Sequence, residues 1–158
     1  MTQTDDLPPC LISIDKEGRW YHKGVEMVRR EFIRLFYQHL SMDSLGRYVI
    51  DWSGERCTLE VEDTAYVVLR VMAGEKGLSG HNRFVLLLSD DSLENLDPGT
   101  LRVGKDHVLY CKVKGCTFPA RFSRPAYYQL AEHVEEEEGI FYLTVNGQRH
   151  ILHQEPCA

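Results

Sequence analysis

The chain has 158 residues, of which 43% are apolar and 27% are charged, a composition typical of a globular protein long enough for one ordinary domain or two small ones. Its net charge of −6 argues against non-specific binding to nucleic acid, which requires the neutralisation of phosphates, so we expect no nucleic-acid polymer as a partner. The longest apolar runs, at 66–69 and 84–88, are far too short to cross a bilayer, so no membrane association is expected either.

Five scattered cysteines, together with an acidic start that lacks the pattern of a secretory signal, predict reduced thiols and a cytoplasmic location. Cys111 and Cys116 are close in sequence, as are His150 and His153, and zinc fingers pair short Cys and His spacings in this way. Because the cysteines flank a predicted strand turn and the histidines come from a hairpin arm, we favour an ordinary buried thiol pair. We expect neither a metal nor a cofactor.

In the N-terminal half, alternating residues predict strands over 10–14 and 19–22. A helix is expected over 29–42, because its apolar residues recur at the spacing of a stripe that faces a core. That stripe consists of Phe32, Ile33, Phe36 and Leu40.

A hairpin is predicted over 47–59, with a tight turn at Ser53 and Gly54 where glycine supplies the positive φ that such turns require. A high content of β-branched and aromatic residues predicts another strand over 65–72. The next segment, 73–82, has three glycines and no apolar periodicity, so we place the boundary between two repeats there. The predicted domains are residues 1–79 and 80–158.

Four strands are predicted in the C-terminal half, over 83–88, 101–104, 107–114 and 118–122. A helix is expected over 124–134, because Pro125 costs no hydrogen bond in a first helical turn and apolar residues follow at helical spacing. The four glutamates at 135–138 are expected to finish this helix as a solvated end.

One structural unit occurs twice in the sequence. A second hairpin, over 140–152, matches the first after a shift of 93 positions, which places Gly147 on Gly54 and Arg149 on Arg56. The helices that precede the two hairpins match at a shift of 94. The alternative is that two unrelated hairpins share turn chemistry, but the common order and spacing favour a duplication. Each repeat would contain a mainly antiparallel sheet and one principal helix, so the predicted fold class is α+β.

No motif of a nucleophile elbow, a metalloprotease or a kinase is present, so we favour a protein that is not an enzyme. Arginines alternate with aromatic residues in several segments. Guanidinium groups bind phosphate in bidentate fashion, and aromatic faces stack on bases. The alternative is that these are ordinary strand residues, alternately packed and solvated. If the two repeats face each other, their arginines and aromatics meet in one cleft, where ligand sites tend to form.

The chain also resembles a bacterial family designated domain of unknown function 1285. The resemblance extends over about 11–152 and rests on short motifs in a common order: Gly18-x-Trp20-x-His22-x-Gly24, Gly46-Arg47-Tyr48, Glu55-Arg56, Val61-Glu62-Asp63, and Arg121-Phe122-Ser123-Arg124-Pro125 followed by Tyr127-Tyr128. It implies a domain duplication whose second half is superficially like a pleckstrin-homology fold. It also implies a small, nucleotide-based ligand at the interface of the two subdomains and a role in bacterial signalling, although no activity is established for the family.

We therefore expect a non-enzymatic module that binds a small, nucleotide-like ligand between two repeated subdomains. Arginines would hold phosphate, acidic residues would position them or accept hydrogen bonds from ribose hydroxyls, and aromatic side chains would stack on the base. The expected ligand-binding residues are Trp20, His22, Arg30, Trp52, Glu55, Arg56, Glu62, Asp63, Arg121, Arg124 and Tyr127. A protein-interaction module that presents a sheet edge or an aromatic face is the alternative, and an enzyme of unknown reaction comes third.

Overall fold

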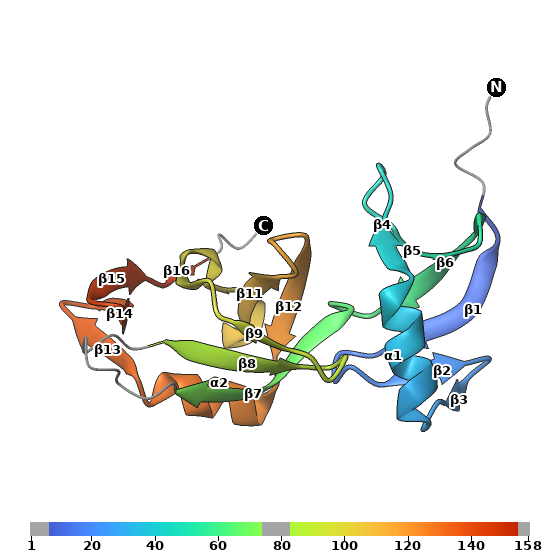
Figure 1. Cartoon of the computed structure of the whole chain (residues 1–158). Coiled ribbons are helices and arrows are strands. Elements are labelled where there is room, and N and C mark those ends of the chain that lie inside the picture. The colour runs from blue at the N-terminus through green and yellow to red at the C-terminus, as the bar shows by residue number, and fades with distance from the viewer. Residues whose placement is uncertain (1–6, 74–82, 155–158) are drawn as a thin grey trace. The chain divides into compact units, whose positions relative to one another are not determined.

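The computed structural model describes residues 7–73 and 83–154, and within them strands predominate, with two α-helices and three sheets (Figure 1). The predicted α+β class is therefore confirmed. The residues form two compact units that divide between Ala65 and Tyr66. The repeat limits at 79/80 stay a prediction, and the expected linker at 73–82 lies, apart from its first residue, outside the described part of the chain.

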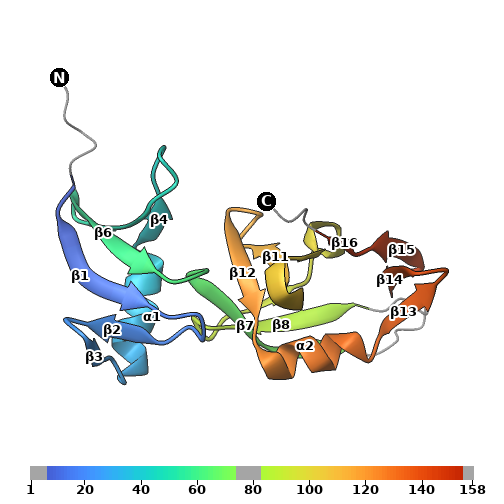
Figure 2. The same ribbon diagram turned by 180° about the vertical axis from the view of Figure 1, so that it is seen from behind.

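The N-terminal unit is built on a six-stranded sheet with the strand order β3-β2-β1-β6-β5-β4. Helix α1 (Arg30–Gln38) lies across one face of this sheet, as the two opposite views in Figures 1 and 2 show. Neighbouring strands are antiparallel except for β1 and β6, which pair in parallel. The strands are β1 (Pro9–Ile14), β2 (Trp20–His22), β3 (Val25–Glu26), β4 (Leu40–Met42), β5 (Tyr48–Trp52) and β6 (Glu55–Val61).

Aromatic packing attaches α1 to this sheet. Trp20 on β2 is fully buried, and its ring stacks on Phe36 at a centroid distance of 6.0 Å and meets Tyr37 edge-on at 4.8 Å. The Tyr37 hydroxyl donates a 2.7 Å hydrogen bond to the carbonyl of Ala65. Because aromatic side chains bury large areas and such ring pairs add about 0.5–1.5 kcal/mol each, this cluster is the centre of the N-terminal core.

Helix α1 is shorter than predicted, because it ends at Gln38 and residues 40–42 form β4. The predicted stripe is also only partly buried. Ile33 is in the core, whereas Phe32 is 46% exposed, and Tyr37 takes the buried position instead. The pairing of β4 with β5 explains the early end, since it gives Leu40 a place in the sheet, where its side chain is buried.

The prediction that all cysteines are reduced thiols is wrong for Cys10 and Cys57, which form a disulfide across β1 and β6. These residues are 47 positions apart, and the parallel pairing of the two strands brings them together. Among the described residues, Cys111 and Cys116 remain free thiols.

The C-terminal unit contains a seven-stranded sheet with the order β16-β10-β11-β12-β7-β8-β9 and a separate antiparallel sheet of β13, β14 and β15. The strands of the larger sheet are β7 (Tyr66–Ala73), β8 (Phe84–Leu88), β9 (Leu93–Asn95), β10 (Arg102–Val103), β11 (Leu109–Val113), β12 (Phe118–Phe122) and β16 (His153–Gln154). Those of the smaller sheet are β13 (Val134–Glu137), β14 (Ile140–Val145) and β15 (Gln148–Ile151). Two short 3-10 helices, η1 (Pro98–Thr100) and η2 (Lys105–His107), lie between strands of the larger sheet in sequence.

Helix α2 (Arg124–Ala131) is tied to β7 by hydrogen bonds at its start and in its middle. Ser123 caps the helix, since its Oγ accepts a hydrogen bond from the amide of Ala126, while its own amide donates to the carbonyl of Val68 at 2.9 Å. Further along the helix, Gln129 Oε1 accepts a 2.7 Å hydrogen bond from the amide of Val71. These contacts fix which face of α2 looks away from β7.

The predicted extension of the second helix through the glutamate run is wrong, because α2 ends at Ala131 and Val134–Glu137 form strand β13. An acidic run at a helix C-terminus interacts unfavourably with the helix dipole. As a strand, the same residues pair in antiparallel register with β14 and keep their carboxylates exposed. Within the described residues, no helix has the length and apolar content needed to cross a membrane.

Each α-helix is followed by three antiparallel strands whose pairing has the same register. In the first set Ile50 lies opposite Cys57, and in the second set Leu143 lies opposite His150. The other residue pairs of the two hairpins correspond at the same shift of 93 positions. Both hairpins turn on a non-glycine residue and a glycine that have positive φ, as the sequence predicts.

Removal of the disulfide is expected to destabilise the chain, because the bond closes a long loop in the unfolded state. For a loop of this length, Cys57→Ser should lower the free energy of unfolding by about 2–4 kcal/mol. Urea unfolding with and without a dithiol reductant measures this loss. Cys116→Ser, which removes an exposed free thiol, is the matched control, and an unchanged wild-type midpoint in reductant would contradict the prediction.

Candidate functional site

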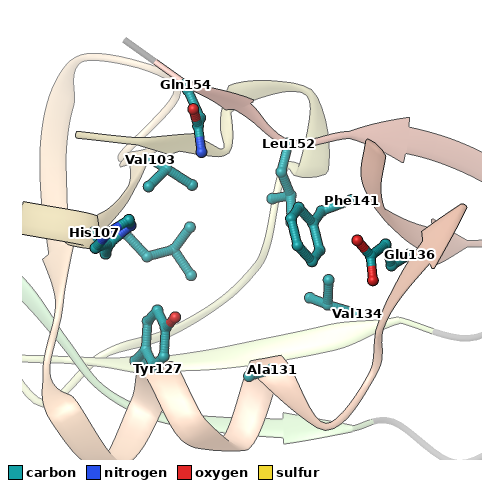
Figure 3. A pocket seen from close by; sticks show the side chains of 10 residues that line it. Val103, His107, Tyr127, Ala131, Val134, Glu136, Phe141, Leu152 and Gln154 are labelled. Atoms are coloured by element: carbon teal, nitrogen blue, oxygen red, sulfur yellow. The ribbon is translucent and has the colours of Figure 1, made fainter. Parts of the chain in front are cut away.

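The C-terminal unit contains a pocket of about 390 Å³ between α2, the β13–β14–β15 sheet and the segments around β10, β11 and β16 (Figure 3). Its volume lies in the range of small-molecule sites, roughly 300–1,000 Å³, and most of its wall is apolar. The lining residues are Val103, His107, Leu109, Tyr127, Ala131, Val134, Glu136, Phe141, Leu152 and Gln154.

Helix and strand periodicity explain which side chains reach the pocket. Tyr127 and Ala131 are four residues apart on α2 and therefore share a face of the helix. On β13, Val134 and Glu136 alternate onto one face of the small sheet, and Glu136 lies directly opposite Phe141 on β14. The register of two hairpin strands thus places an acid beside an aromatic ring at the wall of the pocket.

A strained turn places His107 at the pocket. Asp106 and His107 both have positive φ, 59° and 60°, a conformation that costs a non-glycine residue about 1–2 kcal/mol. The turn is held by backbone hydrogen bonds from Gly104 to the Val108 carbonyl at 2.7 Å and from Val108 to the Lys105 carbonyl at 3.3 Å. Strain of this kind is typical of ligand-binding segments, where the surrounding structure maintains it.

A few polar groups converge on an apolar interior. Figure 3 shows the Tyr127 hydroxyl, the Gln154 amide and the Glu136 carboxylate directed into the cavity, with Phe141 between the last two. Glu136 carries the only formal negative charge among the described lining residues, which include no lysine or arginine. The Phe141 ring is 45% exposed, so apolar surface is available to a ligand. An apolar wall with few polar groups is the usual composition of an organic-ligand site.

The two tryptophans expected to stack on a ligand have different environments. Trp20 is fully buried and has no exposed face, and its Nε1–H has no hydrogen-bond partner among the described residues. Trp52 is 42% exposed on β5, where its ring lies 4.3 Å from that of His39. Only Trp52 of this pair therefore presents a ring surface to solvent.

The remaining predicted residues of the N-terminal unit fall into separate groups. Arg56 lies at the β5–β6 hairpin, with its Nε 3.7 Å from Asp51 Oδ2, and Glu55 is exposed beside it. His22 is exposed on β2, and Arg30 is exposed at the start of α1. After β6, Glu62 Oε1 accepts a 3.0 Å hydrogen bond from the Lys16 amide, and Asp63 is half-buried.

Of the predicted residues in the C-terminal unit, Tyr127 lines the pocket. Arg121 lies on β12 opposite Tyr110, and Arg124 is exposed at the first position of α2. The nine other lining residues are not among the residues predicted from the sequence. The helical spacing of Tyr127 and Ala131 indicates that these two of the ten lining residues share a face of the helix. The positions of the other lining residues depend on how the strands and turns of the folded chain come together.

The cysteines and histidines considered for zinc do not form a metal site. Cys111 is buried on β11, where burial raises the pKa of its thiol to about 12, so it stays protonated at neutral pH. Cys116 is exposed, with its Sγ 3.7 Å from Asp97 Oδ2. Over 7–73 and 83–154, no three Cys, His, Asp or Glu side chains are grouped as metal ligands.

Comparison with solved structures identifies the class of fold. The structure of a DUF1285 family protein from Silicibacter pomeroyi DSS-3 matches with a TM-score of 0.77 over 94% of this chain and 84% of that chain, at 20% identity. A DUF1285 family protein from Shewanella baltica OS155 matches with a TM-score of 0.62 over 77% of this chain and 91% of that chain, at 19% identity. The chain thus has the fold of DUF1285 proteins, which confirms at the level of the fold the resemblance seen in the sequence. No family model and no curated protein matches it.

The different burial of the two tryptophans predicts different effects of their removal. Trp20→Ala should lower the free energy of unfolding by about 3–5 kcal/mol, because it leaves a large cavity in the N-terminal core. Trp52→Ala should cost only about 1 kcal/mol, the value of its exposed ring contacts. Urea unfolding of both variants measures the difference, and equal losses would contradict the assignment of Trp20 to the core.

Proposed function

We propose that the protein binds a small organic molecule in the pocket beside α2. The observation that carries the proposal is a cavity of about 390 Å³ whose wall is mainly apolar and whose few polar groups point inward. Covering the exposed ring of Phe141 would favour binding, since each Å² of apolar surface removed from water contributes about 25 cal/mol.

The composition of the pocket favours a ligand without phosphate. Phosphate recognition uses arginine, lysine or clustered backbone amides, and neither arginine nor lysine is among the described lining residues. The Glu136 carboxylate would repel a phosphate. The nucleotide site expected at the junction of two subdomains is a different site from this pocket, and it stays a prediction. Its phosphate-binding residues would be Arg30, Arg56, Arg121 and Arg124.

We further propose binding without turnover. The lining residues that the structure describes include no serine, cysteine or lysine, which are common nucleophiles of covalent catalysis. A role in bacterial signalling is implied only by the family resemblance. The cytoplasmic location likewise stays a prediction, and the Cys10–Cys57 disulfide weighs against it, because such bonds are typical of oxidising compartments.

The common register of the strands after α1 and α2 supports a duplication. Turn residues, pairing partners and the preceding helix correspond at shifts of 93 and 94 positions, and independent hairpins have no reason to share all three. The pleckstrin-homology likeness of the second half remains an expectation from the family resemblance.

A protein-interaction module is the second candidate, and an exposed apolar surface of the N-terminal unit favours it. Val25 is 70%, Val28 is 77% and Phe32 is 46% exposed, and the Arg29 guanidinium lies 5.8 Å from the Phe32 ring centre. These three exposed apolar side chains are close together in sequence, and a group of exposed apolar side chains often marks a contact with another protein. The double variant Val25→Ser, Val28→Ser should then abolish co-purification of a partner and leave ligand binding in the C-terminal unit unchanged.

Filling the pocket tests the proposed function. Ala131→Phe adds a ring on the pocket side of α2 and should weaken binding of an apolar dye by about tenfold or more, equivalent to ~1.4 kcal/mol. The readout is a fluorescence titration of N-phenyl-1-naphthylamine, which is uncharged at neutral pH. Glu132→Phe adds the same ring at the neighbouring position, which does not line the pocket, and should bind the dye like the wild type. Equal affinities of the wild type and Ala131→Phe would overturn the assignment.

A further inference from the structure

Strand β13 separates its acidic residues onto two faces. Glu135 and Glu137 lie on the face that looks away from the pocket, and Glu136 lies on the pocket face. On the outer face, Glu137 Oε2 accepts a 2.8 Å hydrogen bond from Arg149, whose guanidinium also lies 4.4 Å from the ring centre of Tyr142. The outer face thus has a cation to balance its carboxylates.

The carboxylate of Glu136 has no such partner. Within the part of the chain that the structure describes, no ion pair or hydrogen bond reaches it, and the ring of Phe141 lies beside it across the β13–β14 pair. A carboxylate and the face of an aromatic ring attract a cation by two separate effects, charge pairing and the ring quadrupole. Among the described lining residues, the one formal negative charge therefore lies beside an aromatic ring, where an ammonium group can interact with both.

We propose that the ligand is an organic amine with an apolar body, bound with its ammonium between Glu136 and Phe141. The inference rests on the proposed function and names the class of ligand for the same pocket. The apolar body would lie against Val134 and Leu152. A polar group at the far end of the ligand would meet the Tyr127 hydroxyl or the Gln154 amide, which Figure 3 shows on the side of the cavity away from Glu136.

Competing ligand classes fit less well. A carboxylate or a phosphate would be repelled by Glu136 and would find no lysine or arginine among the described lining residues. An uncharged ligand would gain the apolar contacts and could donate at most a hydrogen bond to the carboxylate, without the charge pairing that an ammonium provides. The charge of the bound molecule, rather than its size, is therefore the property that separates the classes.

Three probes of nearly equal shape test the proposal by calorimetric titration of the full chain: 2-phenylethylamine, 2-phenylethanol and 3-phenylpropionate. The amine should bind about five- to tenfold more tightly than the alcohol, and the acid most weakly. Glu136→Gln should remove the preference for the amine and leave the affinity for the alcohol unchanged. Glu135→Gln makes the same chemical change on the opposite face and should preserve the preference. Added salt should weaken amine binding in the wild type but not alcohol binding.

The outcomes separate this inference from the proposed function. In one outcome, Ala131→Phe weakens dye binding, but the amine binds no more tightly than the alcohol. This result would overturn the inference and leave the proposed function standing. An amine preference that persists in Glu136→Gln would also overturn the inference, because the cation would then be held elsewhere. Absence of both dye and amine binding would overturn both proposals.

Discussion

The register of the β13–β14–β15 sheet is the constraint on which the candidate site depends. A two-residue turn at Asn146-Gly147, with positive φ at both residues, aligns β14 with β15, and β13 pairs with the other edge of β14. A strand shifted by one residue exchanges its two faces, so it would carry Phe141 out of the pocket wall. The register, and with it the identity of the lining side chains, thus depends on two turns that do not line the pocket, Glu138-Gly139 between β13 and β14 and Asn146-Gly147 between β14 and β15. The fixed position of α2 then supplies the opposite wall, because its hydrogen bonds to β7 direct Tyr127 and Ala131 toward the sheet.

Comparison of the two three-stranded segments shows how one arrangement can serve either packing or binding. The N-terminal counterparts of Val134, Glu136 and Phe141 are Leu40, Met42 and Tyr48, from the corresponding pairs of β4 and β5. Leu40 is buried, Met42 and Tyr48 are half-buried, and burial raises the pKa of the Tyr48 hydroxyl. In the N-terminal unit this face contributes to a core. In the C-terminal unit, the counterpart face carries an exposed glutamate and a partly exposed ring, which leaves a cavity open to solvent.

Local chemistry in the sequence was sufficient to predict the hairpins, the start of the second helix and most strands of the C-terminal sheet. Glycine at a primed turn and proline in a first helical turn act through neighbouring atoms, so a single sequence reveals them. The glutamate run was assigned wrongly because β13 has no alternation of apolar and polar residues, and its pairing with β14 is a tertiary effect. The disulfide was missed because the scattered cysteines and the acidic start predicted reduced thiols, while the pairing of Cys10 with Cys57 depends on the parallel contact of β1 with β6. Among the lining residues of the pocket, Tyr127 was predicted as a ligand-binding residue, but for a nucleotide site between two repeats. The other lining residues could not be predicted, because the wall is assembled from segments that only the folded chain brings together.

The open pocket keeps features that lower the stability of the unliganded protein. The exposed part of the Phe141 ring and the left-handed backbone at Asp106 and His107 are both unfavourable in the absence of a bound molecule. The N-terminal unit has an apolar residue at the corresponding position, since Met42 pairs with Tyr48 and both side chains are half-buried. The structure instead keeps apolar surface, a strained turn and an unpaired carboxylate around the same cavity. The apolar surface and the unpaired carboxylate have a common explanation if the cavity is occupied when the protein acts, since one ligand with an apolar body and a positive charge would cover the ring and pair with Glu136.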